Sequence, residues 1–153
     1  MEQHKLLFFD VGETRCAMPM ECAERVIEAV ELATYPEMPS NLEGIMNISG
    51  KLLPVMNLRA LLAQPQKALE PKHFFVIFDS VNGRTAIRAE SLPYPGKAEV
   101  NQDIVFDKLG NKPEQLINLL GQGDQTILVL EPNGLYPQAT ADFVRGIIES
   151  KHD

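Results

Sequence analysis

The segment 44–59 constrains the fold more than any other part of the chain. It places two apolar runs on either side of a Ser-Gly-Lys tripeptide that contains Gly50. Because glycine reaches positive φ without a Cβ clash, a glycine between two apolar runs predicts a β-hairpin. Asn57 follows the second run, and its side chain can accept a hydrogen bond from the free N–H groups that open a helix. The segment therefore predicts two paired strands followed by a short helix over 58–63.

Short apolar runs separated by turn residues also make up most of the remaining chain. The pair Asn82-Gly83 indicates a second hairpin because both residues tolerate positive φ. The polar, proline-bearing segment 64–72 has no periodicity and is expected to be a hinge between two halves. A helix is predicted over 138–149, where apolar residues fall on one helical face. The further strands that we expect are 6–9, 15–18, 74–78, 85–87 and 126–130.

The residues alone do not decide between helix and strand in two segments. In 22–33, apolar residues such as Val26 and Val30 fall at helical spacing, so periodicity favours an amphipathic helix. Segment 113–120 begins with a proline suited to the first turn of a helix, yet it is short enough to be a strand.

Composition and charge restrict the class of protein. With 153 residues, 44% of them apolar and 23% charged, the chain has the composition of an ordinary globular protein. Its net charge of −7 and its lack of a Lys/Arg run argue against binding to nucleic acid or to anionic membrane surfaces. No run approaches the length of a membrane span, so we expect no membrane insertion and a cytoplasmic location. Cys16 and Cys22 are expected to be reduced.

No residue pattern for catalysis or metal binding stands out. The histidines, His4, His73 and His152, have no metal-ligand spacing, and neither cysteine belongs to a C-x-x-C pair. The sequence also lacks the glycine-rich loops that bind phosphates and the G-x-S-x-G motif of hydrolases. We therefore expect no catalytic residue, no metal and no cofactor.

One pattern of residues occurs twice at identical spacing. The first copy lies within 9–18 and the second within 78–87, and each copy spans a predicted hairpin. Two similar hairpins on either side of a proline-containing linker are expected of two related small barrels. The matching residues are Phe9, Asp10, Arg15, Ala17 and Met18 in the first copy, and Phe78, Asp79, Arg84, Ala86 and Ile87 in the second.

The segment 44–59 resembles the signature of the CheW-like domains of bacterial chemotaxis adaptors, which reads roughly G-φ-x-N-φ-R-G-x-φ-φ-P-φ-φ-D-L-R. The resemblance implies a mainly β fold. Two five-stranded SH3-like β-barrel subdomains would pack on a shared core, with short helices and a C-terminal helix over 138–150. The residues that match the signature are Gly44, Asn47, Gly50, Pro54, Leu58 and Arg59.

The resemblance also implies how the chain is divided. The whole chain, 1–153, would be one CheW-like domain. One subdomain would span about 14–72, and the second about 73–137 together with the N-terminal strand. In 22–33 the resemblance implies a short helical turn followed by a strand from about Val26, in place of the helix that periodicity favours.

A non-catalytic adaptor is the function that the resemblance implies. It would couple the cytoplasmic tip of a chemoreceptor to the regulatory domain of a CheA-type histidine kinase, at membrane-associated receptor arrays. Arg59 would form an exposed ion pair with Glu28, and Val26 matches a position in the receptor-contacting groove. The hairpin tip would help to contact receptor or kinase. The partner-binding residues expected on this basis are Val26, Glu28, Asn47, Ser49, Gly50 and Arg59.

The chain departs from the family signature in three places. Ser49 stands where the family has an arginine, which removes a charge-assisted donor from the expected interface. Asn57 replaces an aspartate and can still cap a helix. In the second half, a strand that is usually apolar and ends in Asp reads Ile-Arg-Ala-Glu at 87–90.

Two alternatives to the adaptor remain open, and the departures at Ser49 and Arg88 motivate the first. The domain could bind another signalling partner, such as a component of a pilus-motility array, a diguanylate-type enzyme or a methylation enzyme. It could also be a small enzyme or ligand carrier on a β-barrel, which would show a deep polar pocket with convergent ionisable groups.

Overall fold

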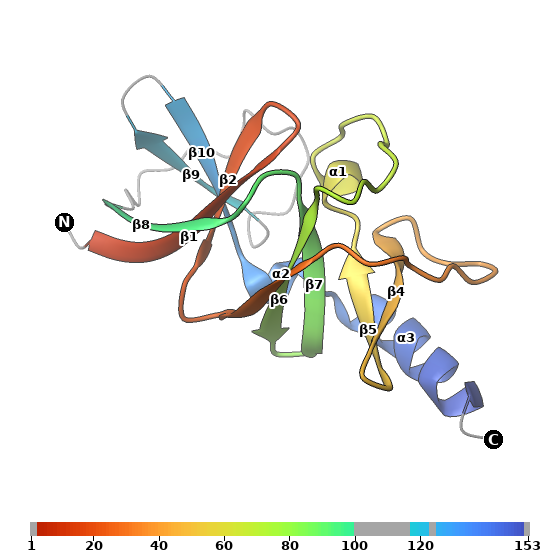
Figure 1. The fold of residues 1–153 in the computed structure, drawn as a ribbon. Helices are drawn as coiled ribbons and strands as arrows, with labels where there is room; N and C mark the ends of the chain where they lie inside the picture. The colour runs from red at the N-terminus through yellow and green to blue at the C-terminus, as the bar shows by residue number, and fades with distance from the viewer. Residues whose placement is uncertain (1–2, 100–116, 123–124, 152–153) are drawn as a thin grey trace.

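The chain forms two five-stranded sheets and three helices in the computed structural model, which describes residues 3–99, 117–122 and 125–151 (Figure 1). Sheet A has the strand order β8-β1-β2-β10-β9, and sheet B has the order β3-β6-β7-β5-β4. The strands of sheet A are β1 (Gln3–Val11), β2 (Thr14–Pro19), β8 (Tyr94–Glu99), β9 (Ile117–Gln122) and β10 (Gln125–Leu130). The strands of sheet B are β3 (Ala23–Glu28), β4 (Leu42–Ile48), β5 (Lys51–Met56), β6 (Phe74–Ser80) and β7 (Gly83–Ala89). The helices are α1 (Leu58–Leu61), α2 (Pro132–Leu135) and α3 (Gln138–Lys151).

The two sheets share one connectivity, which confirms the expected mainly β fold with two five-stranded units. In each sheet a central hairpin, β1–β2 or β6–β7, pairs in parallel with one strand of a second hairpin. The repeated residues of the sequence occupy equivalent registers, since Asp10 lies opposite Arg15 and Asp79 lies opposite Arg84. The repeat in the sequence therefore corresponds to a repeat in the fold.

The division of the chain between the sheets differs from the boundary expected near residue 72. Strand β2 pairs with β1 and β10, so it belongs to sheet A and not with the strands that follow it. Strands β6 and β7 complete sheet B, although they lie beyond residue 72. The boundary placed in the 64–72 segment was wrong for these strands because hydrogen-bonded neighbours in a sheet need not be neighbours in the sequence.

Segment 23–28 is strand β3 and not the helix that its periodicity favours. It pairs with β6 through five registered residue pairs. The strand that the family resemblance implied is thus present, and it begins at Ala23. In 113–120, residues 117–120 lie within β9, whereas 113–116 lie outside the described residues.

Alternating side chains distribute the apolar residues over three clusters. In β1, Leu7, Phe9 and Val11 join the large cluster between the sheets, whereas Leu6 and Phe8 join a smaller cluster within sheet A. Successive side chains of a strand point to opposite faces, so both faces of β1 are covered. The large cluster includes residues of both sheets and of the last two helices, among them Met18, Met56, Val76, Phe78, Leu130, Leu135 and Val144. This cluster is the expected shared core.

The short helices connect the sheets reciprocally. Helix α1 follows β5 of sheet B, and Gln64 just beyond it donates a hydrogen bond to Thr14 Oγ1 of sheet A at 2.7 Å. Helix α2 follows β10 of sheet A, and its Asn133 Oδ1 accepts a hydrogen bond from Val81 N of sheet B at 2.8 Å. Each sheet thus sends a short helix to the central hairpin turn of the other.

Candidate functional site

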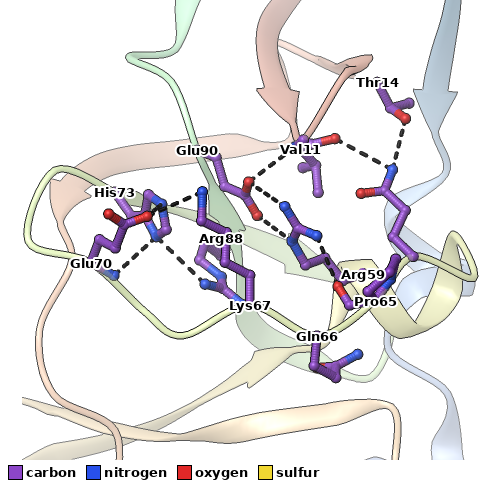
Figure 2. A network of polar contacts seen from close by, with 12 residues as sticks. Val11, Thr14, Arg59, Pro65, Gln66, Lys67, Glu70, His73, Arg88 and Glu90 are labelled. Atoms are coloured by element: carbon purple, nitrogen blue, oxygen red, sulfur yellow. Dashed lines mark hydrogen bonds and ion pairs between the residues drawn. The ribbon is translucent and has the colours of Figure 1, made fainter.

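Arg59 of α1 forms a two-pronged ion pair with Glu90, which directly follows β7 (Figure 2). Arg59 Nε lies 2.6 Å from Glu90 Oε2, and Arg59 Nη2 lies 2.7 Å from Glu90 Oε1. The two side chains are only 10% and 6% exposed. A two-pronged arginine–carboxylate pair fixes geometry as well as charge, so this contact is a rigid joint.

The same ion pair reaches into sheet A. Glu90 Oε1 also accepts a hydrogen bond from Gly12 N, in the β1–β2 turn, at 3.0 Å. Glu90 N donates to Asp10 O at 2.8 Å. Arg59 Nη1 donates to Pro65 O at 2.8 Å. We call Arg59, Glu90 and Gly12 the inter-sheet clamp, because together they join α1, the end of β7 and the β1–β2 turn.

The clamp holds Glu90 in its charged form. The hydrogen bonds from Arg59 lower the pKa of Glu90 from 4.5 to about 2, and the Gly12 N–H acts in the same direction. The carboxylate in turn raises the pKa of Arg59. Both partners therefore stay ionised across the pH range of a cell.

The expected pairing of Arg59 with Glu28 was wrong. Glu28 is exposed at the end of β3, whereas the carboxylate beside Arg59 is that of Glu90. The pair is also enclosed and not on an exposed face. The one sequence signal that pointed toward Glu90 was the Ile-Arg-Ala-Glu departure at 87–90, which places two charged residues at the end of a buried strand.

A second enclosed ion pair accounts for the other charged residue of that departure. Arg88 Nη2 lies 2.9 Å from Glu43 Oε1, and the arginine side chain is 4% exposed. His73 Nδ1 accepts a hydrogen bond from Glu70 N at 3.1 Å and lies 3.5 Å from Arg88 Nη1 (Figure 2). Burial lowers the pKa of His73 and raises the pKa of Glu43. These residues form an internal polar network at one end of sheet B.

Val26 and Glu28 lie on the side of β3 that faces the shared core. Val26 is in register with Val76, a member of that core, and Glu28 is in register with Phe74, which packs against it. Paired residues on neighbouring strands share a face, so all four side chains are on one side of sheet B. β3 is an edge strand, however, and Val26 remains 37% exposed. The structure therefore places an accessible apolar side chain beside an acidic one at this edge.

The hairpin tip is held in a tight turn. Ser49 and Gly50 both have positive φ, at 51° and 87°. Asn47 Oδ1 accepts a hydrogen bond from Gly50 N at 2.9 Å, which closes the turn. Asn47, Ser49 and Gly50 are all exposed, so the predicted turn is present and its side chains are accessible.

The six predicted site residues do not form one site. The hairpin tip lies at one end of β5, whereas Arg59 follows the other end of that strand (Figure 1). β3 and β4 are opposite edges of sheet B, although the bridge between Ala33 and Ile45 brings the chain beyond β3 back to β4. Arg59 is part of the clamp. The remaining residues lie on two separate accessible surfaces, the edge of β3 and the tip of the β4–β5 hairpin.

Within the described residues, no group of three or more His, Cys, Asp and Glu side chains has an arrangement that could hold a metal ion. No helix in this part of the chain combines the length and hydropathy needed to cross a bilayer.

Comparisons with known proteins identify the family. Residues 5–140 match the model of the CheW-like domain. A chemotaxis protein CheW from Thermotoga maritima is 29% identical over 62 residues, a match that covers 40% of this chain and 41% of the length of that protein. The scaffolding protein TtCheW from Thermoanaerobacter tengcongensis has a similar fold, with a TM-score of 0.72 and 15% identity over 91% of this chain and 96% of that one. Because the family model matches most of the sequence, this chain belongs to the CheW-like domain family.

Proposed function

We propose that this protein is a non-catalytic adaptor that couples the cytoplasmic tip of a chemoreceptor to the regulatory domain of a CheA-type histidine kinase. Its family membership supports a scaffolding role in chemotaxis-type signalling. In this role it transfers no chemical group and acts by holding two partners in a fixed geometry. It works in the cytoplasm, at receptor arrays associated with the membrane.

The accessible Val26 carries the proposal. An apolar side chain that stays exposed at the edge of sheet B, beside Glu28, gives a partner both an apolar contact and a charge that sets its orientation. The clamp fixes the two sheets relative to each other. We call the edge of β3 that carries Val26 and Glu28 the Val26 face, and we assign this face to the receptor.

Coupling can be tested by reconstituting the chain with the CheA-type kinase and a chemoreceptor encoded in the same genome. We expect the wild-type chain to raise receptor-dependent autophosphorylation of the kinase. Val26→Glu should abolish this increase and weaken binding to the receptor at least tenfold, because it buries an unpaired charge in an apolar interface. Val81→Glu is the matched control, since Val81 is 77% exposed on the β6–β7 turn. Absence of any complex with either partner would refute the proposal.

The second candidate function is that of a CheW-like scaffold for another signalling partner. Ser49 favours it, because the family arginine is missing from an exposed hairpin tip. Ser49→Arg distinguishes the two functions in the same binding assay. A marked gain in kinase affinity supports the adaptor, whereas unchanged affinity supports the other partner.

A further inference from the structure

A groove of about 510 Å³ lies between the β4–β5 hairpin and α3, next to the start of β3. Its floor contains the buried side chains Leu53, Tyr136 and Val144, and Ile148 lies one helical turn beyond Val144 on α3. Residues four apart on a helix lie on the same face, so α3 presents an apolar ridge along the groove. Arg25 and Lys51 also line it, and we call it the basic groove.

Arg25 stands apart from the other arginines of the chain. Five arginines each form an ion pair with a carboxylate, namely Arg15, Arg59, Arg84, Arg88 and Arg145. Arg25 has no ion-pair partner among the described residues, and within the same residues Lys51 has none either. In a chain of net charge −7, two unpaired cations thus line one groove, next to the Glu24–Arg84 ion pair, which also lines it.

Val26 does not line the basic groove, and the side chains of Arg25 and Val26 point to opposite faces of β3. Arg25 is in register with Ile77, which belongs to the cluster within sheet B, whereas Val26 is in register with Val76 of the shared core. Adjacent residues of a strand point to opposite faces. A partner that contacts Arg25 and a partner that contacts Val26 therefore approach β3 from opposite faces, as a coupling protein requires.

We propose that the basic groove binds a segment of the CheA-type kinase regulatory domain that carries a carboxylate beside aliphatic side chains. The carboxylate pairs with the Arg25 guanidinium, which can form a two-pronged hydrogen bond, while Lys51 adds charge at the rim. The aliphatic side chains pack on Val144 and Ile148. This inference rests on the proposed function, because it assigns the second partner of the adaptor to a specific surface.

The test uses calorimetric titration of the purified kinase regulatory domain into the full chain. Arg25→Glu and Lys51→Glu together are expected to weaken binding at least tenfold, and Arg25→Lys should weaken it less than Arg25→Glu does. Lys97→Glu is the matched control, because Lys97 is also exposed and, among the described residues, has no ion-pair partner. It should change the affinity less than twofold. The wild-type affinity should also fall with added salt more steeply than that of the double variant.

The outcomes separate this inference from the proposed function. If the wild-type chain binds the regulatory domain and the double variant binds it equally well, the groove assignment is overturned and the adaptor function stands. If the wild-type chain binds neither the regulatory domain nor the receptor, the proposed function fails and the groove assignment falls with it. A double variant that loses the receptor as well as the kinase also contradicts the assignment, since the two surfaces would then not be separate. Thermal unfolding of each variant shows whether it is folded.

Discussion

Ala63 carries a backbone conformation that suits glycine better than alanine. It follows the last residues of α1 and has a φ of 56°. Ala63 N donates to Ala60 O at 3.2 Å, and Gln64 N donates to Arg59 O at 2.8 Å. These two bonds are those of the Schellman motif, in which the left-handed residue is usually glycine. The motif orients Gln64, which contacts sheet A, so the strain at Ala63 serves the contact between the sheets.

Ala63→Gly is expected to stabilise the protein by about 0.5–1 kcal/mol, because glycine adopts positive φ without a Cβ clash. Urea unfolding monitored by circular dichroism measures the change. Ala60→Gly is the control: it lies inside α1, where glycine should instead destabilise by a similar amount. A loss of stability in Ala63→Gly would show that the strain argument is wrong.

At the scale of elements, α1 and α2 begin in different ways. Asn57 Oδ1 accepts a hydrogen bond from Ala60 N at 3.1 Å and caps α1. Glu131 precedes α2 and forms no such bond, while Pro132 begins that helix. Proline is tolerated there because the first N–H groups of a helix have no intrahelical partner. Of these two helices, α1 therefore depends on a side chain for its first turn and α2 does not.

Asn57→Ala is expected to cost about 1 kcal/mol of stability, because Ala60 N loses its acceptor. Asn57→Asp should cost less, since a carboxylate can still cap the helix and is favoured at its positive end. Glu131→Ala tests the contrast and should change the stability by less than about 0.5 kcal/mol. The free energies come from chemical denaturation of the three variants. Equal losses in Asn57→Ala and Asn57→Asp would rule out the cap as the cause.

At the scale of the whole molecule, the two sheets are joined by the shared core and by polar contacts at the hairpin turns, of which two are equivalent. Gly12 N of sheet A bonds to Glu90, and Val81 N of sheet B bonds to Asn133. These two N–H groups occupy equivalent places in the repeated hairpins, since both follow the repeated Phe-Asp pair at the turn. The contact of Gly12 is to a charged carboxylate, whereas the contact of Val81 is to a neutral amide. Acid should therefore break the contacts of Glu90 before those of Asn133, because only Glu90 can be neutralised by a proton.

Glu90→Gln is expected to destabilise the protein by about 2–3 kcal/mol at neutral pH, because Arg59 is left without its carboxylate in an enclosed place. The folded-state pKa of Glu90 is about 2, below the ordinary 4.5. Its contribution to stability is therefore complete above pH 4.5 and is lost as the pH falls toward 2. The variant should consequently lose less stability than the wild type across this interval. Urea unfolding at a series of pH values measures both effects.

Glu28→Gln is the control for this experiment, because Glu28 is exposed and was the partner expected from the sequence. It should leave the stability at neutral pH unchanged. If Glu28→Gln costs as much as Glu90→Gln, the pairing of Arg59 with Glu90 is refuted.

The predictions from sequence were most successful where local rules decide the structure. The Gly50 and Asn82-Gly83 turns, the Asn57 cap and the C-terminal helix each depend on a few consecutive residues. Strand β3 was open from its residues alone, because its apolar spacing suits a helix as well as an edge strand. The family resemblance resolved that choice, and the pairing of β3 with β6 explains it physically.

The sequence by itself determined the hairpins, the repeated pattern and the family, since these follow from turn chemistry and from residues close together in the chain. Only the tertiary structure decided which carboxylate meets Arg59, which strands make up each sheet and which cations remain unpaired. Glu90 is 31 residues from Arg59, and Gly12 is 78 residues from Glu90. Such contacts depend on strand order and on the packing of one sheet against the other, because a charge buried between two sheets pairs with whichever carboxylate the topology brings to it.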